Sequence, residues 1–263
     1  MSTRRTVKMK KPIRRSAKLF VIPIVLFSFL FAANVSSGSR RGLKRMPAPV
    51  PAASVSSAMV YDSLQLGGMG LSQEAFMYGL AGFNHLLADG KLRNDSVIAI
   101  VDFSLPSTQK RLFVIDVKNS RLLFNTLVSH GRNSGKLNAT SFSNAINSHK
   151  SSLGFYITDN TYIGEHGLSL RLKGTEKGIN DNAMSRAIVM HGASYVNEDF
   201  AQNQGYIGRS FGCPAIPDEI HEEVIEALKG GTCLFIYSDN KNYIAHSKML
   251  KSNKALAMST PVL

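Results

Sequence analysis

The stretch RAIVMHGASYVNEDFAQNQGYIGRSFGCPAIP, residues 186–217, joins an apolar run to a Gly-Cys-Pro turn. Its first apolar residues predict a short strand that delivers His191 to the rim of a sheet. A polar, loop-like segment follows. Gly212 then allows a sharp turn or a close backbone approach, and Pro214 fixes the backbone after Cys213 and donates no hydrogen bond. The stretch therefore predicts a strand, a loop and a turn that presents a thiol.

Similar apolar runs, separated by polar or Gly-containing turns, predict strands at 96–103, 111–117, 121–128, 153–158, 168–172, 187–190 and 232–237. Two segments have helical spacing of apolar residues. The first is 71–90, with Ser72 as N-cap and Gly90 as stop, and the second lies within 217–231, with Asp218 as N-cap. Many short strands with few helices predict a mainly β sandwich or barrel with a few flanking helices. A doubly wound parallel sheet would need a helix between most strands.

The chain has 263 residues, of which 44% are hydrophobic, enough for one sizeable core. Its net charge of +13 is concentrated at the N-terminus. Residues 1–45 hold 12 of the 31 Lys and Arg residues and no Asp or Glu, so 19 basic and 18 acidic residues remain in 46–263. A nucleic-acid-binding domain would carry a basic face. We therefore expect no nucleic-acid partner.

The N-terminal segment has the order of an export signal. Basic residues precede an uncharged apolar run at 19–35, and small residues follow. A cleaved signal peptide and an uncleaved membrane anchor both fit this pattern. Either one predicts an exported protein of the periplasm or cell envelope, with membrane contact only through this segment. The predicted organisation is a basic N-terminus at 1–45, a linker at 46–58, a catalytic domain at 59–240 and a tail at 241–263.

The chain has two cysteines, Cys213 and Cys233, and export leaves a disulfide between them open. Cys233 lies in a continuous apolar run, where a buried reduced thiol is the ordinary expectation. A zinc site needs three or four ligands. It would have to recruit His130, His166 or His221, which show no tight ligand spacing, so we predict no metal.

Cys213 also fits a nucleophile. A turn of this kind leaves backbone N–H groups free for an oxyanion. Arg209, and His191 if it lies close, would favour the thiolate, which is the reactive form. A Cys paired with a distant His is the pattern of covalent acyl transfer.

These residues occur together with GLSQEAFMYGLAGF, IVDFSLPSTQKRLFVIDV, VSHGRNSG, SSLGFY, YIGEHGLSLRLKG and NDNAMSRAIVMHGA, in this order. With His191-Gly192 and Ser210-Phe211-Gly212-Cys213, the chain resembles the L,D-transpeptidase catalytic domain (YkuD-type) family. It is most similar to the branch of murein L,D-transpeptidase catalytic domain proteins. The resemblance covers roughly residues 60–238.

The resemblance implies a YkuD-type β-sandwich or barrel and a cysteine-dependent L,D-transpeptidase. Cys213 would attack the carbonyl that joins diaminopimelate, or a similar residue, to a terminal D-alanine of a peptidoglycan stem peptide. His191 would take the thiol proton, and the N–H groups of Gly212 and Cys213 would stabilise the oxyanion. Ser210 would orient the imidazole. No metal or organic cofactor is implied.

Two positions depart from the family pattern. Ala215 replaces an Arg that many members have after the Cys, and Phe211 replaces the usual His. A carboxylate-binding Arg must therefore come from elsewhere, and Arg209 and Arg186 are the candidates. Each could equally be a solvated or structural arginine.

His130 and Gly192 complete the predicted substrate contacts. His130 follows a strand and is either a donor that lines the cleft or a loop histidine bonded to backbone. Two alternative functions remain at this stage: an L,D-carboxypeptidase on the same fold, and a non-catalytic peptidoglycan-binding envelope domain. The sequence specifies neither the acyl acceptor nor the oligomeric state.

Overall fold

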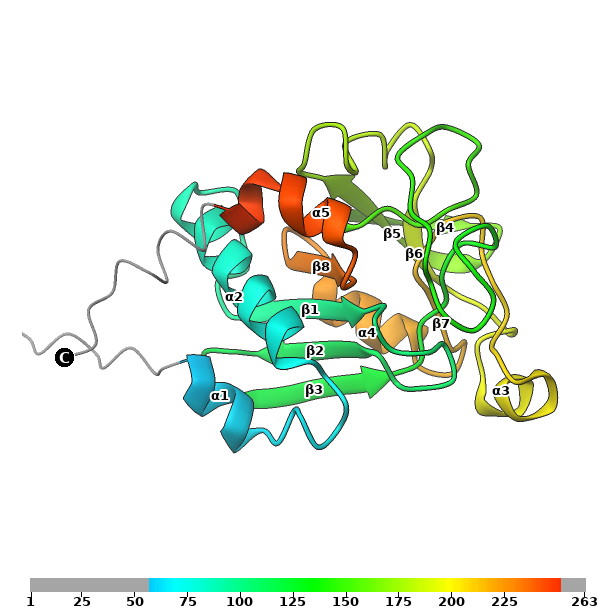
Figure 1. Ribbon diagram of the computed structural model, residues 1–263, viewed down its shortest axis with the longest axis horizontal. Coiled ribbons are helices and arrows are strands. Elements are labelled where there is room, and N and C mark those ends of the chain that lie inside the picture. The colour runs from blue at the N-terminus through cyan, green and yellow to red at the C-terminus, as the bar shows by residue number, and fades with distance from the viewer. Residues whose placement is uncertain (1–56, 252–263) are drawn as a thin grey trace, which may run out of the picture. The chain divides into compact units, whose positions relative to one another are not determined.

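The computed structural model describes residues 57–251 (Figure 1). The predicted export segment, all but two residues of the predicted linker, and residues 252–263 of the predicted tail lie outside the described residues. Within 57–251, no helix is both long and apolar enough to cross a membrane.

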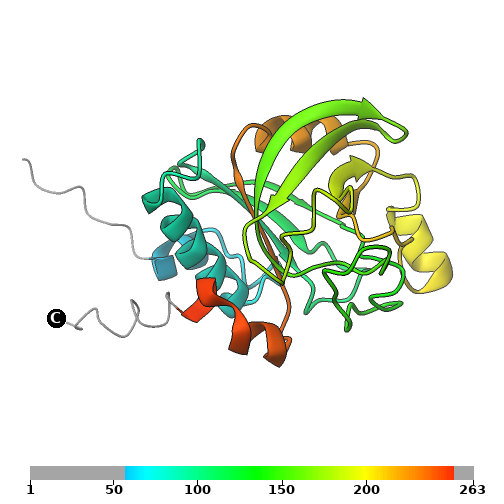
Figure 2. The same ribbon diagram turned by 90° about the horizontal axis from the view of Figure 1, so that it is seen from above.

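One mainly antiparallel sheet of eight strands dominates the described domain, in the order β3-β2-β1-β8-β4-β5-β6-β7. It is nearly closed into a barrel, and Figure 2 shows the long β4–β5 hairpin arching at one side. Two neighbouring pairs, β1 with β8 and β6 with β7, are parallel. The strands are β1 Val97–Asp102, β2 Leu112–Asp116, β3 Arg121–Thr126, β4 Gly154–Gly164, β5 Gly167–Gly174, β6 Val189–Gly192, β7 Ala215–Ile216 and β8 Cys233–Tyr237. The predicted mainly β fold is confirmed.

Short helices flank this sheet: α1 Ser57–Ser63, α2 Gln73–Ala88, α3 Glu198–Gln204, α4 His221–Leu228 and α5 Lys241–His246. Helix α2 lies along β1 and β8 (Figure 1). The Ser72 hydroxyl caps α2 by accepting the Ala75 N–H at 3.0 Å, as the sequence predicts. The predicted Asp218 cap of α4 is wrong. That helix begins at His221, and Ile220 stands at the N-cap without a side-chain hydrogen bond.

The core lies between the central strands and α2. Every residue of β1, β2 and β8 is buried, which explains why these strands appear in the sequence as continuous apolar runs. Phe155 of β4 stacks on Phe235 of β8 with ring centroids 4.1 Å apart. Gly82 lets α2 pack this closely, because a Cβ at that position would lie 2.1 Å from the Phe155 ring.

Helix α5 belongs to the packed domain, although the sequence places residues 241–263 in a tail. The Tyr243 hydroxyl donates to the buried carboxylate of Glu176 at 3.1 Å. The Glu176 carboxylate also accepts the Phe155 N–H at 3.0 Å and the Ser247 hydroxyl. One buried carboxylate thus fastens the C-terminal helix to strand β4.

Candidate active site

A cavity of about 340 Å³ opens where β6, the β4–β5 hairpin and the turn before β7 meet. The register of the sheet creates it. His191 of β6 pairs with Ser169 of β5 on one side and with Ala215 of β7 on the other. Because Cys213 lies two residues before Ala215, this pairing brings the thiol and the imidazole into the same cavity.

His191 is almost fully buried, at 3% exposed. Its Nδ1 lies 2.7 Å from the Gly192 carbonyl oxygen. A carbonyl only accepts hydrogen bonds, so Nδ1 carries the hydrogen and Nε2 is left as the basic nitrogen. Burial lowers the pKa of His191, and the nearby His166 lowers it further. At neutral pH this imidazole is therefore a neutral base.

The Cys213 thiol is partly exposed and accepts the Val189 N–H at 3.4 Å. Burial raises the pKa of the Cys213 thiol, while the Val189 N–H and the Arg186 guanidinium oppose that rise. The cation that favours the thiolate is thus Arg186 and not the predicted Arg209. The resting nucleophile is a neutral thiol that needs a base.

Cys213 and Cys233 are both free thiols, so the disulfide alternative is wrong. Cys233 is fully buried in β8, between Ile98 of β1 and Ile157 of β4. Residues 57–251 contain no group of three His, Cys, Asp or Glu side chains arranged to hold a metal ion.

Ser210 and Gly212 shape the turn itself. The Ser210 hydroxyl donates to the Cys213 carbonyl oxygen at 2.6 Å and accepts the Gly212 N–H at 3.0 Å. The predicted orientation of the imidazole by Ser210 is therefore wrong, since the Gly192 carbonyl fills that role. Gly212 has φ 126°, and a Cβ there would lie 2.8 Å from the Lys150 carbonyl oxygen. The Gly212 N–H is engaged inside the turn, whereas no described residue accepts the Cys213 N–H.

Of the residues predicted to contact the substrate, only some lie in the cavity lining. Arg209 lines the cavity, and its guanidinium donates to the Arg132 and Gly135 carbonyl oxygens at 3.1 Å. Gly192 is buried in β6 and does not line the cavity. Arg186 lies outside the cavity lining, where it donates to backbone and serine oxygens of the segment 143–152.

His130 is completely buried and does not line the cavity, contrary to the predicted cleft-lining donor. Its Nδ1 lies 2.8 Å from Arg111 Nη2, and its Nε2 lies 3.2 Å from the Gly135 carbonyl oxygen. Arg111 can only donate, so Nδ1 accepts and Nε2–H donates. His130 is thus a neutral structural histidine bonded partly to backbone, which is the second of the two alternatives that the sequence left open.

Sequence reasoning assigned no catalytic or substrate role to the cavity residues of the β4–β5 hairpin. Tyr162, Glu165 and His166 come from this hairpin and line the cavity, as does Tyr195 after β6. The His166 ring stacks on the His191 ring, with centroids 4.4 Å apart and planes 19° apart. Only the β5–β6 register reveals this contact, because the two histidines are 25 positions apart in the sequence.

Solved structures of similar fold include an L,D-transpeptidase from Mycobacterium smegmatis. It is 12% identical, with a TM-score of 0.33, and the match covers 54% of this chain and 58% of that one. The helical cell shape determining protein Pgp2 from Campylobacter jejuni is 13% identical, with a TM-score of 0.40, over 71% of this chain and 62% of that one. The chain therefore spans about 60% of the length of these proteins.

A search of curated proteins finds no significant match. A model of the L,D-transpeptidase catalytic domain family, in contrast, matches residues 68–237, which is more than half of the chain and includes every residue of the cavity described above. The chain belongs to the L,D-transpeptidase catalytic domain family.

Proposed function

We propose that this protein is a cysteine-dependent L,D-transpeptidase that acts on peptidoglycan stem peptides through a thioester on Cys213. One observation carries the proposal: a partly exposed free thiol shares a cavity with a buried neutral imidazole whose Nδ1–H is held by the Gly192 carbonyl. Family membership gives this pair its reaction class.

The first half-reaction begins with proton transfer from the Cys213 thiol to Nε2 of His191. The thiolate attacks the carbonyl carbon before the terminal D-amino acid of the donor stem. The amine of that residue leaves with the proton from His191, and a thioester remains on Cys213. Because burial raises the thiol pKa and lowers the imidazole pKa, the resting pair is a neutral thiol and a neutral imidazole, and the thiolate forms only when this proton transfer begins the half-reaction.

The Cys213 N–H is the proposed oxyanion donor. It has no acceptor among the described residues and belongs to the residue that carries the nucleophile. The Gly212 N–H is already bonded to the Ser210 hydroxyl, so we assign Gly212 and Ser210 to the shape of the turn. Arg209, the arginine in the cavity lining, is the proposed partner of a substrate carboxylate.

In the second half-reaction an acceptor amine attacks the thioester and His191 takes the amine proton. The bond between the acyl carbon and the Cys213 sulfur breaks, the cross-link forms, and His191 returns the proton to the leaving thiolate. Water in place of the amine would make the enzyme a carboxypeptidase. A stem peptide of the cell wall is the proposed substrate, so we also propose that the domain is exported, as the basic and apolar N-terminus predicts.

Mass spectrometry of the purified full chain with muropeptides tests this chemistry. We expect a thioester adduct on Cys213 and release of a D-amino acid, both lost in Cys213→Ala. The matched control is Cys233→Ala, which removes the core thiol and should leave the adduct intact. Absence of an adduct on the wild-type chain would overturn the proposal, and the cross-linked or trimmed product distinguishes transfer from hydrolysis.

A further inference from the structure

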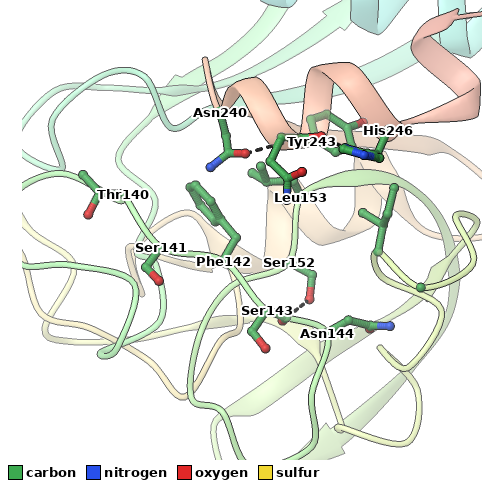
Figure 3. Close-up of a pocket in the computed structure, with 13 residues that line it drawn as sticks. Thr140, Ser141, Phe142, Ser143, Asn144, Ser152, Leu153, Asn240, Tyr243 and His246 are labelled. Carbon is green, nitrogen blue, oxygen red and sulfur yellow. Dashed lines mark hydrogen bonds between the residues drawn. The ribbon is translucent and has the colours of Figure 1, made fainter.

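A second pocket, of about 310 Å³, lies where the segment 140–153, the turn at 178–179 and helix α5 converge (Figure 3). It shares no lining residue with the Cys213 cavity. Its volume is at the lower end of the range of small-molecule sites, roughly 300–1,000 Å³. The proposed transpeptidase reaction makes no use of it.

The lining of this pocket combines polar and apolar surface. Hydroxyl and amide side chains predominate, and no Lys, Arg, Asp or Glu takes part. Apolar surface comes from Phe142, Leu153 and Ile179. Phe142 is half-buried and stacks behind on Phe103, with ring centroids 6.3 Å apart and planes 11° apart, so this ring is held in place. An anionic or cationic ligand would find no opposite charge here.

The walls of this pocket are held by hydrogen bonds to the rest of the domain. The Asn144 amide donates to Asp181 at 2.8 Å, and its oxygen accepts the Asn182 N–H at 3.1 Å. The Ser152 hydroxyl donates to the Ser143 carbonyl oxygen at 2.9 Å. These bonds fix the shape of the pocket before any ligand binds.

Other polar groups of the lining are unused. Among residues 57–251, no side-chain hydrogen bond engages the Thr140 hydroxyl, the Asn242 amide or the Asn240 Nδ2. His246 donates through Nδ1 to the Asn242 carbonyl oxygen at 2.8 Å, so its Nε2 remains an acceptor. The pocket therefore offers both donors and acceptors, without net charge, beside the Phe142 ring.

We propose that this pocket binds a neutral sugar unit. A sugar ring carries hydroxyl groups that both donate and accept, and its C–H face packs on an aromatic ring. This combination matches the uncharged lining, the unused amide and hydroxyl groups and the fixed Phe142 ring. The proposal goes beyond the proposed acyl transfer, because neither Cys213 nor a peptide takes part.

Isothermal titration of the wild-type full chain with chitotetraose and, separately, cellotetraose tests the proposal. We expect saturable binding of at least one of them at millimolar concentration, with an affinity reduced about fivefold by Asn242→Ala, equivalent to about 1 kcal/mol. Asn242 is exposed, so this variant should fold, and an unchanged thermal transition would verify that. The matched control is Asn203→Ala, the same exchange at an exposed site on α3, which should bind as wild type does.

No saturable binding of either oligosaccharide would overturn the sugar site, as would equal affinity of wild type and Asn242→Ala. These sugars carry no peptide. A failure of thioester formation on Cys213 therefore cannot produce either result, and the two proposals fail separately.

Discussion

Lowering the pH from 7 to 5 should remove part of the free energy of unfolding through His130, because this residue is buried as a neutral imidazole. Burial, reinforced by the positive charges of Arg111 and Arg209, lowers the pKa of His130 from 6.5 to about 4, although the Gly135 carbonyl partly opposes this. Protonation would also turn the Nδ1 acceptor into a donor that faces Arg111 Nη2 at 2.8 Å. The folded protein therefore resists the proton that the unfolded chain accepts.

The sign and size of the effect follow from linkage. Between pH 6.5 and about 4 the unfolded state binds more protons, so stability falls as the pH falls through 6.5 and levels off below the folded pKa. Each pH unit costs about 1.4 kcal/mol, so His130 should account for a loss of about 2 kcal/mol between pH 7 and pH 5. His191, whose pKa burial also lowers, adds a loss of the same sign.

Urea unfolding at pH 7 and pH 5 measures this loss, followed by circular dichroism because the chain has no Trp. In His130→Gln the amide can accept from Arg111 and donate to Gly135 but cannot titrate in this range. The variant should lose about 2 kcal/mol less than wild type between the two pH values. The control His85→Gln, on helix α2 beside Asp89, should behave as wild type. Equal losses in wild type and His130→Gln would refute the assignment.

Three further predictions concern the site and the C-terminal helix. Gly212→Ala should cost roughly 1–3 kcal/mol in thermal unfolding and slow acylation, since φ is 126° and the new Cβ meets the Lys150 carbonyl oxygen; an unaltered melting temperature and rate would contradict this. His166→Ala should raise the pKa of His191 and move the acid limb of the acylation rate to higher pH, because it removes a ring whose charge lowers that pKa and which covers the imidazole. A pH profile identical to wild type would argue against it. Glu176→Gln should lower the free energy of unfolding by roughly 1–3 kcal/mol and expose residues 240–251 to proteolysis, because it weakens the hydrogen bonds that hold α5 to β4; wild-type resistance to both urea and protease would disprove this.

The strands were predictable from the sequence because most of them are buried on both faces. Continuous apolar runs such as 97–101 in β1 and 233–237 in β8 are stable only when the strand is buried on both faces of the sheet. The elements that were missed are short or polar. Strand β7 has two residues, and helix α3 buries none of its side chains, so neither leaves an apolar pattern to read. Helix α5 is fixed mainly by Tyr243, a single buried residue.

The partners of the polar side chains were not predictable in the same way. Arg186 binds the carbonyl oxygen of Ser143, which is 43 positions away, and His130 binds Arg111 at 19 positions. No local pattern encodes such contacts, because they depend on how the loops fold over the sheet. The sequence thus indicated which residue types could line a cleft. It did not indicate that Arg186 and His130 instead make hydrogen bonds that hold other segments of the domain together.

For the two cysteines, the local sequence predicts the setting of each thiol but not the hydrogen bonding of the turn around Cys213. An apolar run around Cys233 requires burial, and a Gly-Cys-Pro turn requires an irregular backbone at Cys213, so their different settings follow from the residues alone. Which N–H of the turn remains free does not follow from them. That depends on the Ser210 hydroxyl, which could orient an imidazole or close the turn and in this fold closes the turn. Of the two expected oxyanion donors, Gly212 and Cys213, this one hydroxyl therefore leaves only the Cys213 N–H as the proposed donor. The imidazole is oriented instead by a backbone carbonyl of its own strand.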